Sequence, residues 1–371
     1  PEHPTLRTHR VAIGQYDLAG EGLVRRRRVE LDVVGERTDV PDLVGERQPD
    51  LLLLNDDDLT YAKIRLDNRS VDTLSAHLSR IVDPLARALC WAATWDMVRD
   101  AELPTRRFVD LVMAHGPVED DDANLQRLLG QASVAVEAYG DPDNRRPTRA
   151  RLAAAARRGL EAAEPGSDRQ LIWARARIGA GDTVEDLAWD RGLLDGTVVV
   201  EGLVVDTDLR WDLVGVLASH GADDDGALVD AEEKRDPTDI GERRAATARA
   251  SRPEPEAKAE AWRKLTEESL HLAMVRAVTG GCSQWRQEDL LRPYVEPYFS
   301  NLLTWWKERP REVALALIGG LYPGKLIEPA TVAATDAALE DESLPAPVRR
   351  ILLEDKDGVE RALRARGADR G

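Results

Sequence analysis

The segment Asp206-Thr207-Asp208-Leu209-Arg210-Trp211 places two carboxylates beside a guanidinium group. A guanidinium presents a planar row of donors, so Arg210 could bind the carboxylate of a peptide through two parallel hydrogen bonds. The same residues also suit the start of a helix, with Thr207 or Asp208 as the N-cap and Arg210 in a local ion pair. We favour the helix start, and we keep Asp206, Asp208 and Arg210 as candidate contacts with a peptide or with another domain.

A second acidic cluster, Asn55–Asp58, follows four consecutive leucines. Its oxygen atoms could bind calcium, but in an EF-hand loop that began at Asp56 the required glycine would be replaced by Tyr61. A turn whose side chains cap backbone amides explains this cluster better. A third acidic run, Asp223–Asp225, precedes a predicted helix, where negative charge suits the helix dipole.

The histidines are too dispersed for a helical zinc site. Such a site needs two histidines four residues apart with a glutamate between them, and none of the six histidines has another at that distance. Gly319–Lys325 has the glycine and lysine spacing of a phosphate-binding loop, but Leu326 stands where a magnesium-binding hydroxyl is required. No nucleophile motif is present either. We therefore expect no catalytic residue, no metal site and no cofactor in this chain.

The composition is that of a globular protein that does not bind nucleic acid. The chain has 371 residues, of which 43% are hydrophobic and 32% are charged, so it can form two or more domains with their own cores. Its net charge of −17 would repel a nucleic acid, and no apolar run is long enough to span a membrane. Cys90 and Cys282 fall within separate helical patterns, so we expect reduced packing residues and a cytoplasmic location.

Strand periodicity dominates residues 1–67. The segments Leu6–Leu18 and Leu23–Val34 alternate apolar and polar residues on either side of a glycine turn, which predicts a hairpin. The run Leu51–Leu54 predicts a buried strand, and the alternation in Tyr61–Leu66 predicts a half-buried one. We therefore expect a small antiparallel sheet or half sandwich, one face of which must be covered by other elements.

Helix periodicity dominates residues 68–371. Asp83 followed by a proline predicts the start of an apolar helix that ends near Ala101, and the turn-rich segment Gly140–Pro147 predicts a break between helices. We expect the tail after Arg364 to be frayed. Further helices are predicted from Pro104, and at Ala123–Tyr139, Thr148–Ala163, Ser167–Ile178, Asp182–Asp190, Leu209–His220, Gly226–Arg235, Asp239–Arg249, Glu256–Thr266, Glu268–Val278, Arg311–Ile318, Pro329–Leu339 and Val348–Arg364. So many consecutive helices pack most naturally as a solenoid of stacked pairs.

Four segments in the same order resemble the aminopeptidase N family of zinc aminopeptidases in its actinobacterial form. They are PDLLLLNDDDLTYAKIRLD (Pro49–Asp67), PLARALCWAATWDMVRDAELP (Pro84–Pro104), GLLDGTVVVEGLVVDTDLRWDLV (Gly192–Val214) and LLRPYVEPYF (Leu290–Phe299). The zinc-binding H-E-x-x-H motif of that family is absent, as is its glycine-alanine-methionine-glutamate-asparagine segment. The chain thus resembles the C-terminal part of the family without the catalytic part.

This resemblance implies a mostly α fold with a small β part. Residues 1–67 would be the end of a β-sandwich domain, and residues 68–371 would form a HEAT-like α-superhelix. The whole enzyme would use zinc to release amino-terminal residues from peptides, and the helical domain would close over the catalytic domain to form part of the chamber that admits peptides. The partners expected for this chain are therefore the catalytic domain of a longer parent chain and peptide substrates, with zinc held in the parent enzyme.

Two other functions remain open from the sequence. The chain could be a free-standing α-solenoid that binds a protein partner. It could also be a hydrolase that uses a pair of carboxylates, which would require convergent acidic residues with raised pKa values in a pocket. If the resemblance holds, the chain should hydrolyse nothing by itself.

Overall fold

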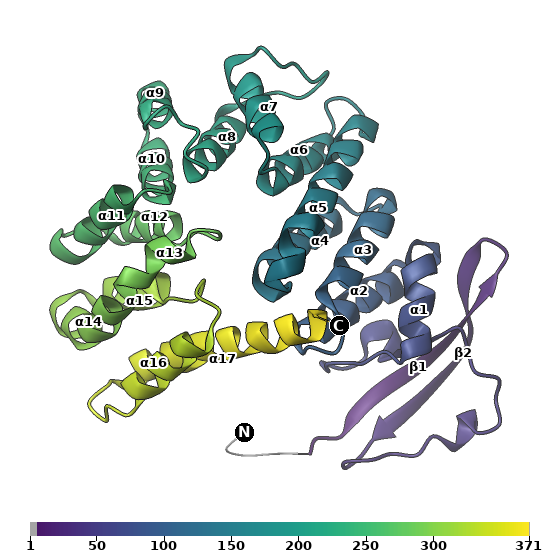
Figure 1. Cartoon of the computed structure of the whole chain (residues 1–371). Coiled ribbons are helices and arrows are strands. Elements are labelled where there is room, and N and C mark those ends of the chain that lie inside the picture. The colour runs from purple at the N-terminus through teal and green to yellow at the C-terminus, as the bar shows by residue number, and fades with distance from the viewer. Residues whose placement is uncertain (1–5, 371) are drawn as a thin grey trace. The chain divides into compact units, whose positions relative to one another are not determined.

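The computed structural model describes residues 6–370 and is mostly α-helical with a small antiparallel sheet near the N-terminus, as predicted (Figure 1). Short 3-10 turns and one π-helix, Ala135–Tyr139, lie between the longer elements. The α-helices are α1 (Asn68–His77), α2 (Pro84–Arg99), α3 (Thr105–His115), α4 (Asp122–Val134), α5 (Pro142–Ala162), α6 (Asp168–Ala180), α7 (Val184–Asp195), α8 (Thr207–Ser219), α9 (Ala227–Arg235), α10 (Asp239–Ser251), α11 (Pro255–Glu267), α12 (Leu272–Cys282), α13 (Glu288–Leu291), α14 (Val295–Glu308), α15 (Arg311–Leu321), α16 (Pro329–Leu339) and α17 (Ala346–Asp369).

The sheet has three strands in the order β2-β1-β3. Strands β1 (His9–Ala19) and β2 (Gly22–Val33) form the predicted hairpin, and β3 (Leu51–Leu54) pairs antiparallel with the other edge of β1. The prediction of a further strand at Tyr61–Leu66 is wrong. Its alternation has another origin, because the basic residues Lys63 and Arg65 both reach Asp100 at the end of α2.

The acidic cluster after β3 is held by side chains of the hairpin. Asp56 is fully buried and accepts hydrogen bonds from the Tyr16 hydroxyl at 2.9 Å and from Arg25 at 2.9 Å. Gly14 of β1 makes room for it, since a Cβ at that position would lie 2.2 Å from Asp56 Oδ2. The predicted turn is confirmed as the 3-10 turn Asp56–Asp58, and Asn55 caps a backbone amide as expected, because its Oδ1 accepts a hydrogen bond from the Thr60 amide at 3.2 Å, whereas Asp56 binds side chains.

The chain divides into two compact units. The first unit comprises the residues up to Asp141 together with those from Ala365 onward, and the second unit comprises Pro142–Arg364. These units are defined by contacts, whereas the expected domain boundary at residue 67 follows the change from strands to helices, so it stays a prediction.

The helices of the second unit form two layers. In one layer α6 contacts α8, α8 contacts α10, α10 contacts α12 and α12 contacts α15. The second layer consists of the helices α7, α9, α11 and α14, which pack against helices of the first layer. Paired helices of this kind are what a solenoid requires.

Several helix starts in the second unit differ from those predicted, among them that of α12, which begins at Leu272 instead of Glu268. Helix α5 begins at Pro142 instead of Thr148 and contains Pro147 at its sixth position, where the proline cannot donate the backbone hydrogen bond of a regular helix. The N-cap of α7 is Thr183, which forms a capping box with Asp186.

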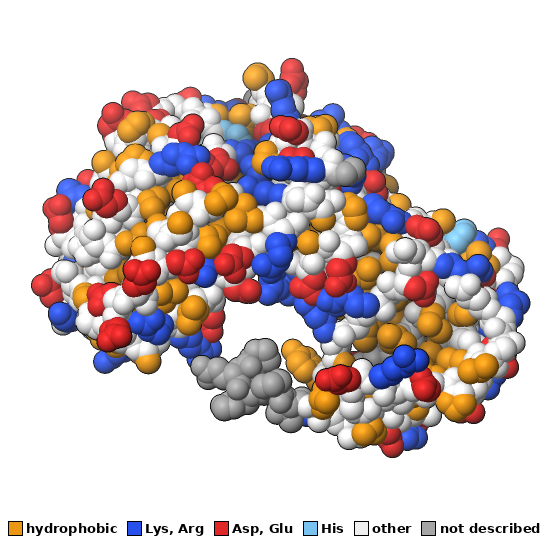
Figure 2. Space-filling view, turned by 60° about the horizontal axis from the view of Figure 1, so that its bottom comes forward, with side chains coloured by type: hydrophobic (Ala, Val, Ile, Leu, Met, Phe, Trp, Pro, Cys, Tyr) orange, Lys and Arg blue, Asp and Glu red, His pale blue; other side chains and the backbone are white. Residues whose placement is uncertain are grey.

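Charged side chains of both signs are visible on the surface of the molecule (Figure 2). On the face shown in Figure 2, basic and acidic side chains are intermixed. Many of them form ion pairs between neighbouring elements, such as Arg249 with Glu233 at 2.5 Å. None of the helices among residues 6–370 is both long and apolar enough to cross a membrane.

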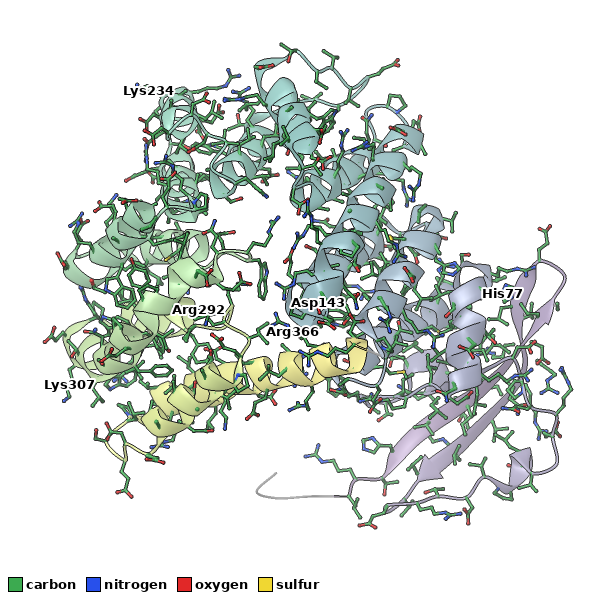
Figure 3. The ribbon with its side chains drawn as sticks, in the orientation of Figure 1. His77, Asp143, Lys234, Arg292, Lys307 and Arg366 are labelled. Carbon is green, nitrogen blue, oxygen red and sulfur yellow. The ribbon has the colours of Figure 1, made fainter. Side chains whose placement is uncertain are left out.

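The C-terminal turn of α17 is folded into the first unit, so the prediction of a frayed tail after Arg364 is wrong. Asp369 is 1% exposed, and its carboxylate accepts hydrogen bonds from the backbone amides of Arg106 at 3.0 Å and Asp141 at 3.1 Å. Arg366, labelled near the end of α17 in Figure 3, donates to the Ala138 carbonyl of the π-helix at 3.0 Å. A buried acceptor therefore orders a segment that its polar sequence alone would leave in water.

Candidate functional site

The titratable residues do not converge on a metal centre. Within residues 6–370, no group of three or more His, Cys, Asp or Glu side chains could hold a metal ion. His115 binds the Ser79 hydroxyl at 3.0 Å, and His220 binds the Val216 carbonyl at 2.8 Å. Cys90 and Cys282 are buried free thiols, which confirms their expected role in packing, and burial raises the pKa of both.

Two of the three candidate contact residues have partners within the helical array. Asp206 is the N-cap of α8 and accepts a hydrogen bond from the Leu209 amide at 2.9 Å, so the cap lies before the Thr207 or Asp208 that we predicted. Asp208 pairs with Arg244 of α10 at 2.8 Å and is exposed. Contact of either carboxylate with a peptide or another domain stays a prediction.

Arg210, the third candidate, binds a carboxylate of its own chain. Its guanidinium pairs with Glu232 of α9 through Nε to Oε1 at 2.8 Å and Nη2 to Oε2 at 2.7 Å, and Nη1 donates to the Leu194 carbonyl at 2.9 Å. The Glu232 side chain is 3% exposed. The bidentate geometry that suited a peptide carboxylate is therefore already used to join α7, α8 and α9.

One pair of carboxylates lies a single helical turn apart on α7. Burial raises the pKa of Asp190 to about 7. At Asp186 burial acts in the same direction, but hydrogen bonds from Thr183 and the charge of Arg157 outweigh it and lower the pKa. Asp190 is 1% exposed and Asp186 is 6% exposed, so a substrate could not reach them. This pair does not support a carboxylate hydrolase.

Two open grooves run along the layer formed by α6, α8, α10, α12 and α15. The first groove has a volume of about 550 Å³ and lies between α6, α8 and α10, with Arg175, Asp212 and Arg244 among its lining residues. The second groove has a volume of about 760 Å³ and lies between α12 and α15, with Arg276 and Glu312 at its sides. Each groove carries both signs of charge.

Glycines inside the helices are among the residues that line both grooves. Gly179 and Gly215 line the first groove, and Gly280 and Gly319 line the second. A Cβ atom at Gly179, Gly215 or Gly280 would meet nothing within 4 Å, and one at Gly319 would meet only ordinary contact at 3.9 Å. Since glycine weakens a helix by roughly 1 kcal/mol relative to alanine, packing does not account for these four residues.

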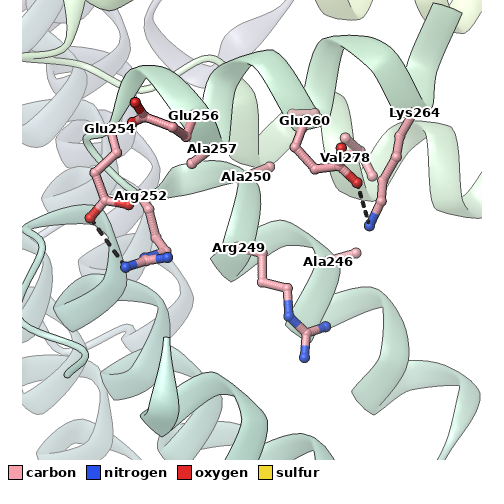
Figure 4. A pocket seen from close by; sticks show the side chains of 11 residues that line it. Ala246, Arg249, Ala250, Arg252, Glu254, Glu256, Ala257, Glu260, Lys264 and Val278 are labelled. Atoms are coloured by element: carbon pink, nitrogen blue, oxygen red, sulfur yellow. Dashed lines mark ion pairs between the residues drawn. The ribbon is translucent and has the colours of Figure 1, made fainter. Parts of the chain in front are cut away.

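A third pocket, of about 290 Å³, lies between α10 and α11 (Figure 4). Four of its charged side chains are already paired, Arg252 with Glu254 at 3.2 Å and Glu260 with Lys264 at 3.7 Å. Arg249 is bound by Glu233, outside the pocket. The pocket therefore offers little charge to a ligand.

Comparison with known proteins identifies relatives over nearly the whole chain. Residues 51–361 match the family model described as the ERAP1-like C-terminal domain. A protein named Aminopeptidase N from Streptomyces lividans is 48% identical over 368 residues, which are 99% of this chain and 43% of that protein. The chain therefore spans less than half the length of this relative.

Among solved structures, the crystal structure of Legionella pneumophila aminopeptidase A in complex with aspartic acid matches 95% of this chain and 45% of that one. The TM-score is 0.41 and the identity is 9%.

Proposed function

Because this chain belongs to the ERAP1-like C-terminal domain family, we propose that it is the non-catalytic C-terminal portion of an aminopeptidase N-like zinc peptidase. What supports the proposal is the match at 48% identity to less than half of an aminopeptidase N. In the complete enzyme this portion caps the catalytic domain and forms part of the chamber that peptides enter.

The catalytic zinc expected of the complete enzyme does not fit this chain. The described residues offer no ligand set for it, and the H-E-x-x-H motif is absent from the sequence. The zinc and the residues that act with it would therefore belong to another part of the parent protein. This chain would contribute to the binding of peptides and to their access to the chamber.

The two grooves lined in part by glycines are the surfaces that we propose as peptide-facing walls. Glycine in a helix exposes the helix backbone and lets another chain approach closely. An extended peptide has a backbone that needs such room, and a groove of mixed charge imposes little preference on its side chains. The grooves therefore suit substrates of varied sequence.

A chimeric enzyme tests the proposal. The matching segment of the Streptomyces lividans protein would be replaced by this chain, and the hydrolysis of an aminoacyl-anilide and of a peptide of about ten residues would be compared with the same protein lacking the segment. We expect the chimera to cleave both substrates, and the isolated chain to cleave neither. A folded chimera that cleaves the peptide no better than the truncated protein would contradict the proposal.

Substitutions in the grooves then test the peptide-facing walls. Gly215→Trp and Gly319→Trp fill the two grooves, so each should lower kcat/KM for the peptide by about tenfold and leave the aminoacyl-anilide unaffected. Gly358→Trp is the matched control, because a Cβ at this exposed glycine of α17 also meets nothing within 4 Å. Equal losses for both substrates, or a loss at Gly358 as well, would contradict this role.

A further inference from the structure

Five consecutive residues, Gln284–Glu288, run from the connection after α12 to the first residue of α13 and bind several separate elements of the second unit. We call this segment the clasp. Its side chains reach the end of α12, the loop after α15, the ends of α8 and α10, the loop before α7, and α5. Such a concentration of contacts in one short connection is unlike the pairwise packing of the helices around it.

The two glutamines of the clasp cap helix ends. Gln287 is 6% exposed, and its Nε2 donates to the carbonyls of Ser219 at 3.0 Å and Ser251 at 2.9 Å, the last residues of α8 and α10. Gln284 donates to the Gly281 carbonyl of α12 at 3.0 Å. One segment thus satisfies backbone carbonyls that three helices leave without partners at their ends.

Charged groups extend the clasp to both sides. Glu288 pairs with Arg145 of α5 at 3.5 Å, although the two residues are far apart in the sequence. On the other side, the Lys325 ammonium lies 3.7 Å from the centre of the Trp285 ring. These contacts connect the first helix of the second unit with the loop that follows α15.

Arg286 is the centre of the clasp. Its φ of +69° lies in the left-handed region, which is strained for arginine. Its Nη1 lies 3.1 Å from His220 Nε2 and 3.9 Å from Asp182 Oδ2, and Asp182 also accepts a hydrogen bond from Arg149 of α5 at 2.7 Å. The contacts of the side chain hold the backbone in this conformation.

The hydrogen bonds of His220 determine which of its nitrogens carries the proton. Nδ1 lies 2.8 Å from the Val216 carbonyl, which can only accept, so Nδ1 must be the donor. In the neutral ring Nε2 is then an acceptor, and it receives the Arg286 N–H. A protonated ring would present an N–H and a positive charge to this guanidinium, and the hydrogen bond would be lost.

We propose that the clasp holds the helices of the second unit in one arrangement and that protonation of His220 releases it. The inference goes beyond the proposed peptidase role, because it rests only on contacts within the second unit. Acidification is therefore expected to loosen the clasp and the ends of α8 and α10 while the helices themselves persist.

The charges around His220 give the direction of the pH dependence. Burial lowers the pKa of His220, the guanidinium groups of Arg286 and Arg149 lower it further, and the Val216 carbonyl and Asp182 oppose them. The unfolded or open chain therefore binds the proton more readily than the closed clasp. Closure is fully stable above the ordinary histidine pKa and weakens as the pH falls below about 6.5.

Hydrogen–deuterium exchange of the complete chain tests this proposal. Exchange in peptides that cover residues 283–291 would be measured at about pH 7.5 and pH 5.5 and corrected for the intrinsic rate. We expect about fivefold faster exchange at the lower pH, the factor that the loss of one hydrogen bond allows. His220→Gln cannot titrate and should remove this pH dependence, whereas His115→Gln, in the first unit, should keep it.

Arg286→Gln provides a second variant in case His220→Gln does not fold. It should exchange rapidly in this segment at both pH values, since the clasp is already open. Wild-type exchange that does not change with pH would overturn the proposal. A pH dependence that persists in His220→Gln or in Arg286→Gln would overturn it as well.

Discussion

Two adjacent glycines of α12 have opposite surroundings and provide a sharp test of the packing. A Cβ at Gly281 would lie 2.2 Å from the Thr247 carbonyl oxygen of α10, whereas a Cβ at Gly280 would meet nothing within 4 Å. The close approach is fixed by a hydrogen bond from the Thr247 hydroxyl to the Ala277 carbonyl at 3.0 Å. Alanine at the two positions should therefore have effects of opposite sign.

The magnitudes follow from the contacts. The Thr247 carbonyl cannot rotate away without disrupting the backbone of α10. Gly281→Ala must therefore widen the gap between α10 and α12 by about 1 Å, which should lower the free energy of unfolding by about 1–3 kcal/mol. Alanine recovers up to about 1 kcal/mol of helix propensity at either position. The free energy of unfolding should thus fall by about 1–2 kcal/mol for Gly281→Ala and rise by about 0.5–1 kcal/mol for Gly280→Ala.

Urea unfolding followed by circular dichroism would measure the difference. With a slope of about 2 kcal/mol per molar urea, the midpoints of the two variants should differ by about 1 M. The wild-type chain should lie between them. If the two variants have the same midpoint, or if Gly280→Ala is the less stable one, the assignment of Gly281 to the helix contact and of Gly280 to an open groove is refuted.

Three further predictions concern buried polar groups. Arg210→Met leaves the buried Glu232 carboxylate with only the longer ion pair to Arg235 at 3.8 Å. Thermal denaturation should then show that the free energy of unfolding falls by about 3 kcal/mol, most of which the double variant with Glu232→Leu recovers; a double variant no more stable than the single one would contradict this. Gly14→Ala would place a Cβ 2.2 Å from Asp56 Oδ2. Urea unfolding should show that the free energy of unfolding falls by about 2–4 kcal/mol. A change within about 0.5 kcal/mol would show that the contact is not tight. Burial lowers the pKa of Lys258 to about 8, so between about pH 8 and pH 10.5 the unfolded chain binds more protons and the free energy of unfolding should rise with pH. Lys258→Met should remove part of this rise, and an unchanged slope would refute the assignment.

The sequence predicts the elements well where periodicity is strong and local. The hairpin of β1 and β2 and the helix Pro329–Leu339 are found as predicted. The strand predicted at Tyr61–Leu66 fails because its basic residues alternate in order to reach Asp100, a tertiary contact that a local pattern does not contain. The early start of α5 was hidden by prolines, which indicate a turn unless one knows that they fall at the beginning of a helix.

The candidate site was less predictable, because its residues belong to no catalytic or metal-binding motif that the sequence could reveal. Arg210 attracted attention as a group that could bind a carboxylate, and only the fold shows that Glu232 of α9 already occupies it. The glycines of the grooves were visible in the sequence as glycines within helical patterns, which is a weak signal. Gly280 and Gly281 look alike in the sequence, and only the position of α10 distinguishes them.

The buried position of Asp369 has a consequence for the synthesis of this protein. The residues that complete the first compact unit lie at the opposite end of the chain, 263 positions from the amide of Arg106 that they cap. Domains generally fold as units while the N-terminal part of a chain leaves the ribosome first. Here the first compact unit can be completed only after α17 has been made, and the amides of Arg106 and Asp141 stay uncapped until then. A ribosome that stalls within the second unit would therefore leave the first compact unit unfinished and dependent on chaperones.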